Sequence, residues 1–466
     1  MKNNFIYIIL LFYVIIAALT IIFFDGTGDA GDSIQHYLFA KFAPKHPELY
    51  FDHWAKPVFV LLASPFAQFG FTGIKIFNAI ISLFTILFTF KSSRELNLKN
   101  AIASTVLLIF SPLFYILTFS GLTEPLFALF ISVWLYAVLK KNYLTASLII
   151  SFLPFVRSEG LIIICVFATY LLLIRAWRYL PYLLSGHLLY SIAGYFIYGD
   201  FLWVFNKIPY LGINPGYGSG KLFHFVDQLF YVIGMPVYIL FSIGLIKIFF
   251  NFIKKRNNKI GPPILILSAF AAFFISHSLF WYYGIFNSMG LKRVLVGITP
   301  LIAIMALVGY NFISEIVFAN QKTLNLIVRT SIIATIIIFP FTSNPAAIHW
   351  EKDMRLSKAQ QSAKEVANYI QKEIPANRCY FYSHPYLSIA LNVDPFDINK
   401  RQDLKIDVID KLKTGDLIIW DNWFAKIENG ITTKELLDNN INLSNIFNSN
   451  ENDKSSETIY SVYLRK

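Results

Sequence analysis

Long runs of apolar residues recur along most of the chain, and they limit its fold more than any other feature. Several runs reach the roughly 20 residues that a helix needs to cross a hydrocarbon core of about 30 Å. Backbone polar groups in lipid must be satisfied within the segment, which favours helices. Only 15% of the 466 residues are charged, whereas a typical soluble domain has about 25%. The sequence therefore predicts an α-helical polytopic membrane protein.

We predict eleven membrane helices within a transmembrane domain of residues 1–341. They cover residues 5–24, 73–90, 101–119, 124–140, 143–156, 160–174, 181–198, 225–250, 262–283, 294–312 and 324–341. The apolar stretch 57–69 is shorter and contains Pro65, so we expect it to lie at the membrane interface. It belongs to a long first outer loop, residues 25–72, which is predicted to contain interfacial helices.

Basic residues predict the orientation of these helices. With the N-terminus inside, the inner loops would hold most of the basic clusters, as the positive-inside rule requires. These residues are Lys91, Arg94, Lys99, Lys140, Lys141, Arg175, Arg178, Lys254, Lys255, Arg256, Lys259 and Lys322. An odd number of helices places both the first loop and the C-terminal tail outside. Because the formal net charge of +12 is explained by these clusters, we predict no nucleic-acid partner.

The composition changes near Thr342, where charged and Asn-rich sequence replaces the apolar runs. A helix is predicted over residues 356–373, and strands are predicted at "RCYFYS", "DLIIWD" and "TIYSVYL". A second helix, "TTKELL", would begin with a capping box of Thr432 and Glu435. We interpret the Asn-rich stretch "NNINLSNIFNSNEND" as a loop. Residues 342–466 are thus predicted to form a small extracytoplasmic α/β domain.

The first outer loop begins with an acidic, glycine-punctuated turn, "FFDGTGDAGDSIQHY". We interpret Asp25 as the polar end of the first helix, and Asp32 or Ser33 as the cap of a short helix that carries His36. Asp29 is a weaker supporting candidate. A carboxylate such as Asp32 can accept a proton from an incoming hydroxyl group within hydrogen-bond distance.

Four further charged motifs adjoin apolar segments on the predicted outer face. Each has an ordinary explanation, such as an interfacial lysine, an acidic helix start or a polar turn. Charged groups at membrane depth are nevertheless functional candidates by default. The motifs are "DHWAKPV" with His53 and Lys56, "LTEPL" with Glu124, "RSEG" with Arg157 and Glu159, and "LKRVLVGITP" with Lys292 and Arg293. Together they predict an outer cavity with acids for a nucleophile and cations for a phosphate.

The order of these motifs resembles the GT-C class of integral-membrane glycosyltransferases. The likeness is to the branch of protein O-mannosyltransferases and lipid A aminoarabinose transferases. It rests on "GDSIQHY", "HPELYFDHWAKPVFVLL", "LTEPL", "RSEG" and "LKRVLVGITP", and it covers residues 5–312. The chain departs from the family pattern at Ser33, where members have a second acid, and at Val58, where they have a second proline.

The resemblance implies transfer of a sugar from a polyprenyl-phosphate donor to an acceptor on the outer face, with inversion at the anomeric carbon. It makes Asp32 the base and Lys56, Arg157 and Arg293 the phosphate-binding residues. The supporting or sugar-contacting residues would be Asp29, His36, His53, Glu124 and Glu159. We predict no metal cofactor, although Asp29, Asp32 and His36 could together bind a divalent ion. The acceptor would be a glycan, a lipid or a protein, and the location a bacterial cytoplasmic membrane.

Other functions are compatible with a polytopic bundle that contains polar groups. A transporter or exporter of lipid-linked saccharides is the main alternative. Transporters usually place such groups near the midplane and often show inverted repeats, whereas here the groups lie at predicted helix ends and no repeat is visible. A polysaccharide polymerase or ligase, or a non-catalytic scaffold, would be further alternatives.

Overall fold

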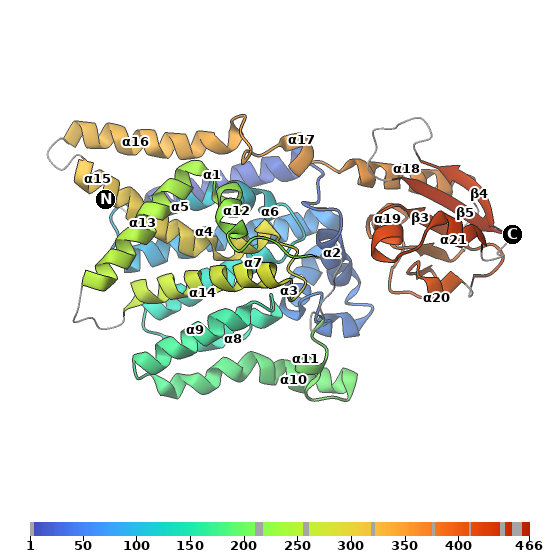
Figure 1. Cartoon of the computed structure of the whole chain (residues 1–466), viewed down its shortest axis with the longest axis horizontal. Helices are drawn as coiled ribbons and strands as arrows, with labels where there is room; N and C mark the ends of the chain where they lie inside the picture. The colour runs from blue at the N-terminus through green and yellow to red at the C-terminus, as the bar shows by residue number, and fades with distance from the viewer. Residues whose placement is uncertain are drawn as a thin grey trace.

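The computed structural model describes residues 4–209, 218–254, 261–317, 322–374, 378–409, 412–438, 443–449 and 459–466. A helical bundle makes up most of the molecule, and a smaller α/β unit lies at one end of its long axis (Figure 1). The bundle begins with α1 (Asn4–Phe23), α2 (Asp32–Phe42), η1 (Pro47–Phe51), α3 (Pro57–Ala67), α4 (Gly70–Glu95), α5 (Ala103–Ile109), α6 (Pro112–Thr118) and α7 (Glu124–Leu139). It continues with α8 (Tyr143–Ser151), η2 (Leu153–Phe155), α9 (Gly160–Leu173), η3 (Trp177–Leu184), α10 (Ser185–Tyr198) and α11 (Trp203–Asn206). Its last elements are α12 (His224–Ile233), α13 (Met235–Lys254), α14 (Pro262–Tyr283), η5 (Lys292–Ile298), α15 (Thr299–Val317), α16 (Lys322–Ile338) and η6 (Phe339–Phe341).

Six helical segments in the described residues are long and apolar enough to cross a membrane, judged by length and composition. They are Phe5–Phe23, Gly70–Glu95, Met235–Ile253, Pro262–Tyr283, Lys292–Glu315 and Thr323–Phe341. Shorter apolar helices cover Pro57–Ala67, Glu124–Leu139, Tyr143–Phe155 and Gly160–Leu173. The mainly helical architecture is confirmed, whereas eleven crossings remain a prediction.

Several of the predicted membrane helices are interrupted in the structure. The segment 101–119 forms α5 and α6, and Pro112 begins the second of these because proline suits the first turn of a helix. The segment 225–250 breaks at Gly234, whose φ of 74° is readily adopted by glycine. The segment 181–198 begins in η3 and continues as α10. The helices α5 and α6 have only seven residues each, so hydropathy alone does not separate them.

The strands of the C-terminal unit form one sheet in the order β2-β1-β3-β5-β4. Strands β1 (Tyr380–Tyr382), β2 (Arg401–Gln402) and β3 (Leu417–Asp421) are parallel, and β5 (Tyr460–Arg465) pairs antiparallel with β3 and with β4 (Leu443–Asn448). The helices of this part are α17 (Trp350–Asp353), α18 (Lys358–Glu373), α19 (Tyr386–Ala390), α20 (Ile406–Ile409) and α21 (Thr433–Asp438). A π-helical turn, η7 (Phe424–Glu428), follows β3.

The C-terminal unit contains most of the elements that the sequence predicts for it. The helix predicted over 356–373 is α18, and the three predicted strands are β1, β3 and β5. The capping box is also present, because the Glu435 carboxylate accepts a hydrogen bond from the Thr432 N–H at 2.8 Å. The loop predicted for the Asn-rich stretch is wrong where β4 forms, since Leu443–Asn448 pairs with β5. The residues on either side of this strand, 439–442 and 450–458, lie outside the described part.

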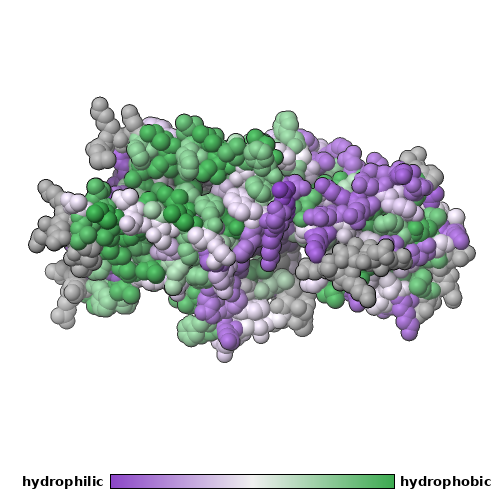
Figure 2. Space-filling view, turned by 90° about the horizontal axis from the view of Figure 1, so that it is seen from above, coloured by the Kyte–Doolittle hydropathy of each residue, from purple (hydrophilic) through white to green (hydrophobic). Residues whose placement is uncertain are grey.

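The C-terminal unit packs against the acidic turn of the first loop. The Gln360 side chain donates a hydrogen bond to Thr27 Oγ1 at 2.7 Å, and the Gly26 N–H donates one to the Met354 carbonyl at 2.7 Å. Hydrophobic residues gather over the helical bundle and hydrophilic ones over the junction and the C-terminal unit (Figure 2). The division into domains at residue 341 remains a prediction, although the last long apolar helix ends near this position.

Candidate active site

The start of α2 is held by Asp29. The Asp29 carboxylate accepts hydrogen bonds from the N–H groups of Gly31 at 3.0 Å and Ser33 at 2.9 Å. Asp32 is the first residue of the helix and Gly31 its N-cap, so the prediction that Asp32 or Ser33 caps α2 is wrong. The Asp29 side chain, two and four residues before its donors, thus satisfies two backbone N–H groups at the start of the helix. The Asp32 carboxylate is therefore available for other partners.

Glu124 lies between two arginines at the start of α7. The side chain is fully buried, and its Oε1 is 2.7 Å from Arg157 Nη1 and 3.4 Å from Arg293 Nε. The motif "LTEPL" does begin a helix with Pro125 in its first turn, as the ordinary interpretation requires. The Glu124 carboxylate also forms ion pairs with two guanidinium groups from distant segments. The ordinary interpretation as a helix start therefore holds, and a functional role of Glu124 stays a prediction.

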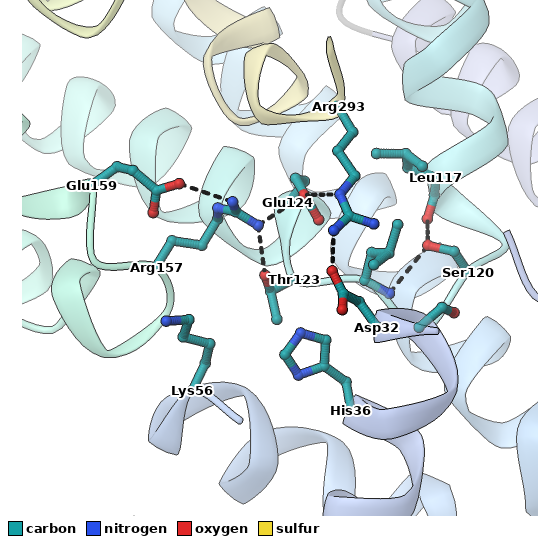
Figure 3. Close-up of polar contacts among 12 residues, drawn as sticks. Asp32, His36, Lys56, Leu117, Ser120, Thr123, Glu124, Arg157, Glu159 and Arg293 are labelled. Atoms are coloured by element: carbon teal, nitrogen blue, oxygen red, sulfur yellow. Dashed lines mark hydrogen bonds and ion pairs between the residues drawn. The ribbon is translucent and has the colours of Figure 1, made fainter. Parts of the chain in front are cut away.

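Arg293 connects this carboxylate to the acidic turn (Figure 3). Its guanidinium group forms ion pairs with Asp29 and Asp32, and Figure 3 shows the contact with Asp32. The side chain of Asp32 is 43% exposed, compared with 26% for Asp29. Asp32 is thus the acid of this pair that an incoming molecule reaches more easily.

Arg157 forms the other half of the cluster. Its Nη2 donates a hydrogen bond to Glu159 at 2.8 Å, and its Nη1 donates one to Thr123 Oγ1 at 3.2 Å. The Glu159 carboxylate also lies 4.0 Å from Nε2 of His277 in α14. Burial opposes ionisation of Glu159, but the positive charge of Arg157 outweighs it and lowers the pKa to about 2. Glu159 is therefore an ionised partner that orients Arg157.

Lys56 approaches the same cluster from the loop before α3. Its Nζ donates hydrogen bonds to the His53 carbonyl and to Ser158 Oγ, both at 3.3 Å. The residue has a φ of 70°, an unusual conformation for a residue other than glycine. Burial lowers its pKa to about 8. Figure 3 shows the ammonium group directed toward Arg157.

The two histidines of the prediction occupy different places. His36 stacks on Trp54 with ring centroids 4.9 Å apart, and its ring faces the cluster below Asp32 (Figure 3). Burial lowers the pKa of His36 to about 3, so the ring is neutral at physiological pH. The His53 ring instead contacts the Val204 carbonyl at 2.9 Å, and it is the main chain of His53 that touches Lys56. A direct role of the His53 ring at the cluster is not supported by these contacts.

The Asp32 and Asp29 carboxyl groups differ in acidity. Partial burial raises the pKa of Asp32, but the guanidinium of Arg293 more than offsets this and holds it below its usual range. Burial dominates at Asp29, whose pKa is raised despite the same arginine. The pKa values of titratable groups at functional sites are often shifted by burial and by neighbouring charges in this way. Asp32 is consequently the more acidic of the two carboxyl groups.

Three polar contributors to the cluster were not predicted as site residues. Thr123 and Ser158 lie within the motifs "LTEPL" and "RSEG", next to residues that were singled out. His277 stands alone in an apolar helix, and a polar side chain in such a segment is itself a functional signal. Among the residues that the structure describes, no group of three or more His, Cys, Asp or Glu is arranged to hold a metal ion.

The helical bundle and the C-terminal unit together can be compared with the folds of known proteins. No protein-family model matches the sequence, and no curated protein matches it. Several solved chains do match the fold. The crystal structure of ArnT from Cupriavidus metallidurans bound to undecaprenyl phosphate has a TM-score of 0.65 and 12% identity, and the match covers 99% of this chain and 98% of that one.

The second solved structure is ArnT from the same organism in the apo state. Its TM-score is 0.63 and its identity 10%, and the match covers 97% of each chain. At these identities the likeness establishes the fold. It agrees with the polytopic helical fold that the motifs predict, and it extends over the C-terminal unit, which no motif covered.

Proposed function

We propose that the protein is a glycosyltransferase that moves a sugar from a polyprenyl-phosphate donor to an acceptor at the outer face of the membrane. The observation that carries the proposal is the convergence of Lys56, Arg157 and Arg293 beside Asp32. These residues come from two loops, the 3-10 helix η5 and the start of α2, and their contacts join them into one cluster. Burying so many charges is costly, which favours a functional reason for the arrangement. The undecaprenyl phosphate bound to ArnT supports the choice of donor.

In this proposal the three cations bind the phosphate of the donor. Arginine suits this task because its planar guanidinium presents paired donors to phosphate oxygens. As the bond between the anomeric carbon and the phosphate oxygen breaks, its electron pair passes to the lipid phosphate. The added negative charge is then stabilised by groups already held in place.

Asp32 is the proposed base. An oxygen or nitrogen of the acceptor attacks the anomeric carbon from the side opposite the leaving phosphate, which inverts the configuration. The acceptor proton passes to the Asp32 carboxylate. A phosphate entering the cluster competes with this carboxylate for Arg293, and a weaker Asp32–Arg293 ion pair makes Asp32 a stronger base.

The remaining candidates have supporting roles. Glu124 and Glu159 orient the two arginines, and Asp29 holds the start of α2 and shares Arg293. His36 provides a neutral ring beside the base. His53 acts through its main-chain carbonyl, which accepts a hydrogen bond from Lys56.

The test is reconstitution in liposomes with radiolabelled polyprenyl-phosphate sugars and a panel of acceptors. The proposal expects label to leave the lipid and appear covalently on an acceptor. Label that crosses the bilayer while still attached to its lipid would instead indicate an exporter. Absence of transfer from every hexose and pentose donor would contradict the proposal.

A further inference from the structure

A turn of the C-terminal unit lies directly beside the acidic turn of the bundle. It follows β3, at the edge where parallel strands end and where α/β sheets commonly bind ligands. The buried carboxylate of Asp421 accepts hydrogen bonds from the N–H groups of Trp423 at 3.0 Å and Phe424 at 2.6 Å. Asn429 donates a further bond to Ser383 Oγ at 2.8 Å. The turn is therefore fixed at both ends.

This turn contacts the N-terminus of α2. A Cβ atom placed on Gly31 would lie 3.5 Å from the ring of Phe424, and Gly31 immediately precedes Asp32. The ring of Phe424 is in turn packed edge-on against His384, with centroids 4.8 Å apart. Residues 421–430 thus border the site next to Gly31 and Asp32.

Two side chains of the turn have the chemistry of a sugar-binding surface. Trp423 is 54% exposed, and its side chain hydrogen-bonds the carboxyl group of Glu428. This bond uses the polar edge of the indole and leaves its apolar face for stacking. Glu428 is exposed, and its interaction with the charge of Asp32 places the two carboxylates near each other. A sugar ring is apolar on one face and carries hydroxyl groups at its rim. Its apolar face can stack on an aromatic side chain, and its hydroxyl groups can donate hydrogen bonds to the carboxylates.

We propose that residues 421–430 form the acceptor subsite and that the acceptor is a saccharide, which stacks on Trp423 and hydrogen-bonds Glu428 while one hydroxyl group faces Asp32. This inference rests on the proposed glycosyl transfer and names its acceptor class. The turn carries a single basic side chain, the exposed Lys426, beside the carboxylates of Glu428 and Asp32, which disfavours a free phosphate as its ligand. A saccharide fits better than a peptide because the turn presents a single aromatic face and carboxylates.

The test uses full-length protein in liposomes with a radiolabelled polyprenyl-phosphate sugar. The acceptor probes are p-nitrophenyl glycosides and a peptide rich in serine and threonine. The subsite predicts transfer to at least one glycoside, with an acceptor KM about tenfold higher in Trp423→Ala and an unchanged donor KM. Trp423→Phe keeps a stacking face and should retain most of the affinity. Ile398→Ala removes a 72% exposed apolar side chain elsewhere in the unit and should match the wild type.

The outcomes separate the subsite from the proposed function. Donor turnover that depends on Asp32 but labels only the peptide, or labels no glycoside, would overturn the saccharide subsite alone. Equal acceptor KM values for Trp423→Ala and wild type would do the same. A wild-type protein that turns over no donor would contradict the glycosyl transfer itself.

Discussion

The Arg293 guanidinium forms an ion pair with the Asp32 carboxylate across 261 residues of sequence. The pair links η5 to α2, and it joins the acidic turn to Glu124 and Arg157 because Arg293 also approaches Glu124. Ion pairs in one network share partners, so the effects of substituting their members will not be additive. The network therefore determines both the shape of the site and the charge state of its base.

Glu124→Gln should destabilise the protein. The substitution leaves the buried ends of Arg157 and Arg293 without the carboxylate between them, and breaking a buried ion pair typically costs about 3–5 kcal/mol. The thermal unfolding midpoint in detergent should fall clearly. Glu95→Gln is the matched control because Glu95 pairs with Lys140 at a partly exposed position, 2.6 Å away, where such pairs contribute less than about 1 kcal/mol. Equal midpoints for both variants would show that Glu124 does not hold the cluster together.

Donor affinity should decrease as the pH rises through about 8. Burial lowers the pKa of Lys56 to about 8, so its ammonium group is charged below that pH and loses its charge above it. The phosphodiester of the donor keeps its charge over this range, and loss of a charged hydrogen bond should raise the donor KM roughly tenfold. Lys56→Arg, which stays charged, should flatten the profile. A wild-type donor KM that is constant between pH 7 and 9 would exclude Lys56 as a phosphate ligand.

Gly121→Ala should separate α2 from the loop before α7. A Cβ at this position would lie 2.3 Å from the Ser33 carbonyl oxygen, and the Gly121 N–H donates a hydrogen bond to Ser33 Oγ at 2.6 Å. The expected result is a lower unfolding midpoint together with a lower transfer rate. Gly31→Ala is the stability control, because its Cβ would meet Phe424 at an ordinary contact distance of 3.5 Å. An unfolding midpoint unchanged by Gly121→Ala would show that this close approach is not required.

The sequence predicts the membership of the charged cluster better than its internal contacts. Hydropathy places Asp32, Glu124, Arg157 and Arg293 at helix ends on one predicted face, which is enough to expect them near each other. It does not specify which acid faces which cation, since this depends on how helices far apart in sequence pack. In the structure Glu124 connects Arg157 to Arg293, although the sequence predicts only a supporting role for it.

Local signals explain where the predicted fold differs from the structure. Gly234 and Pro112 interrupt apolar runs that look continuous by hydropathy, and both residues are known helix breaks or starts. Strand β4 is short and Asn-rich, so its β-structure comes from pairing with β5 rather than from intrinsic preference. His277 was visible as a polar residue in an apolar helix, but its distance of 4.0 Å from Glu159 required the packed structure.

The central claim is tested most directly by the rate of sugar transfer in Asp32→Asn. The asparagine side chain has nearly the same size but accepts no proton, so the rate should fall by roughly 10²–10⁴-fold. Binding of the donor should weaken far less, because the three proposed phosphate-binding residues, Lys56, Arg157 and Arg293, all remain. Asp25→Asn, in the same turn, is the control and should keep the wild-type rate. Transfer by Asp32→Asn at the wild-type rate would contradict the account.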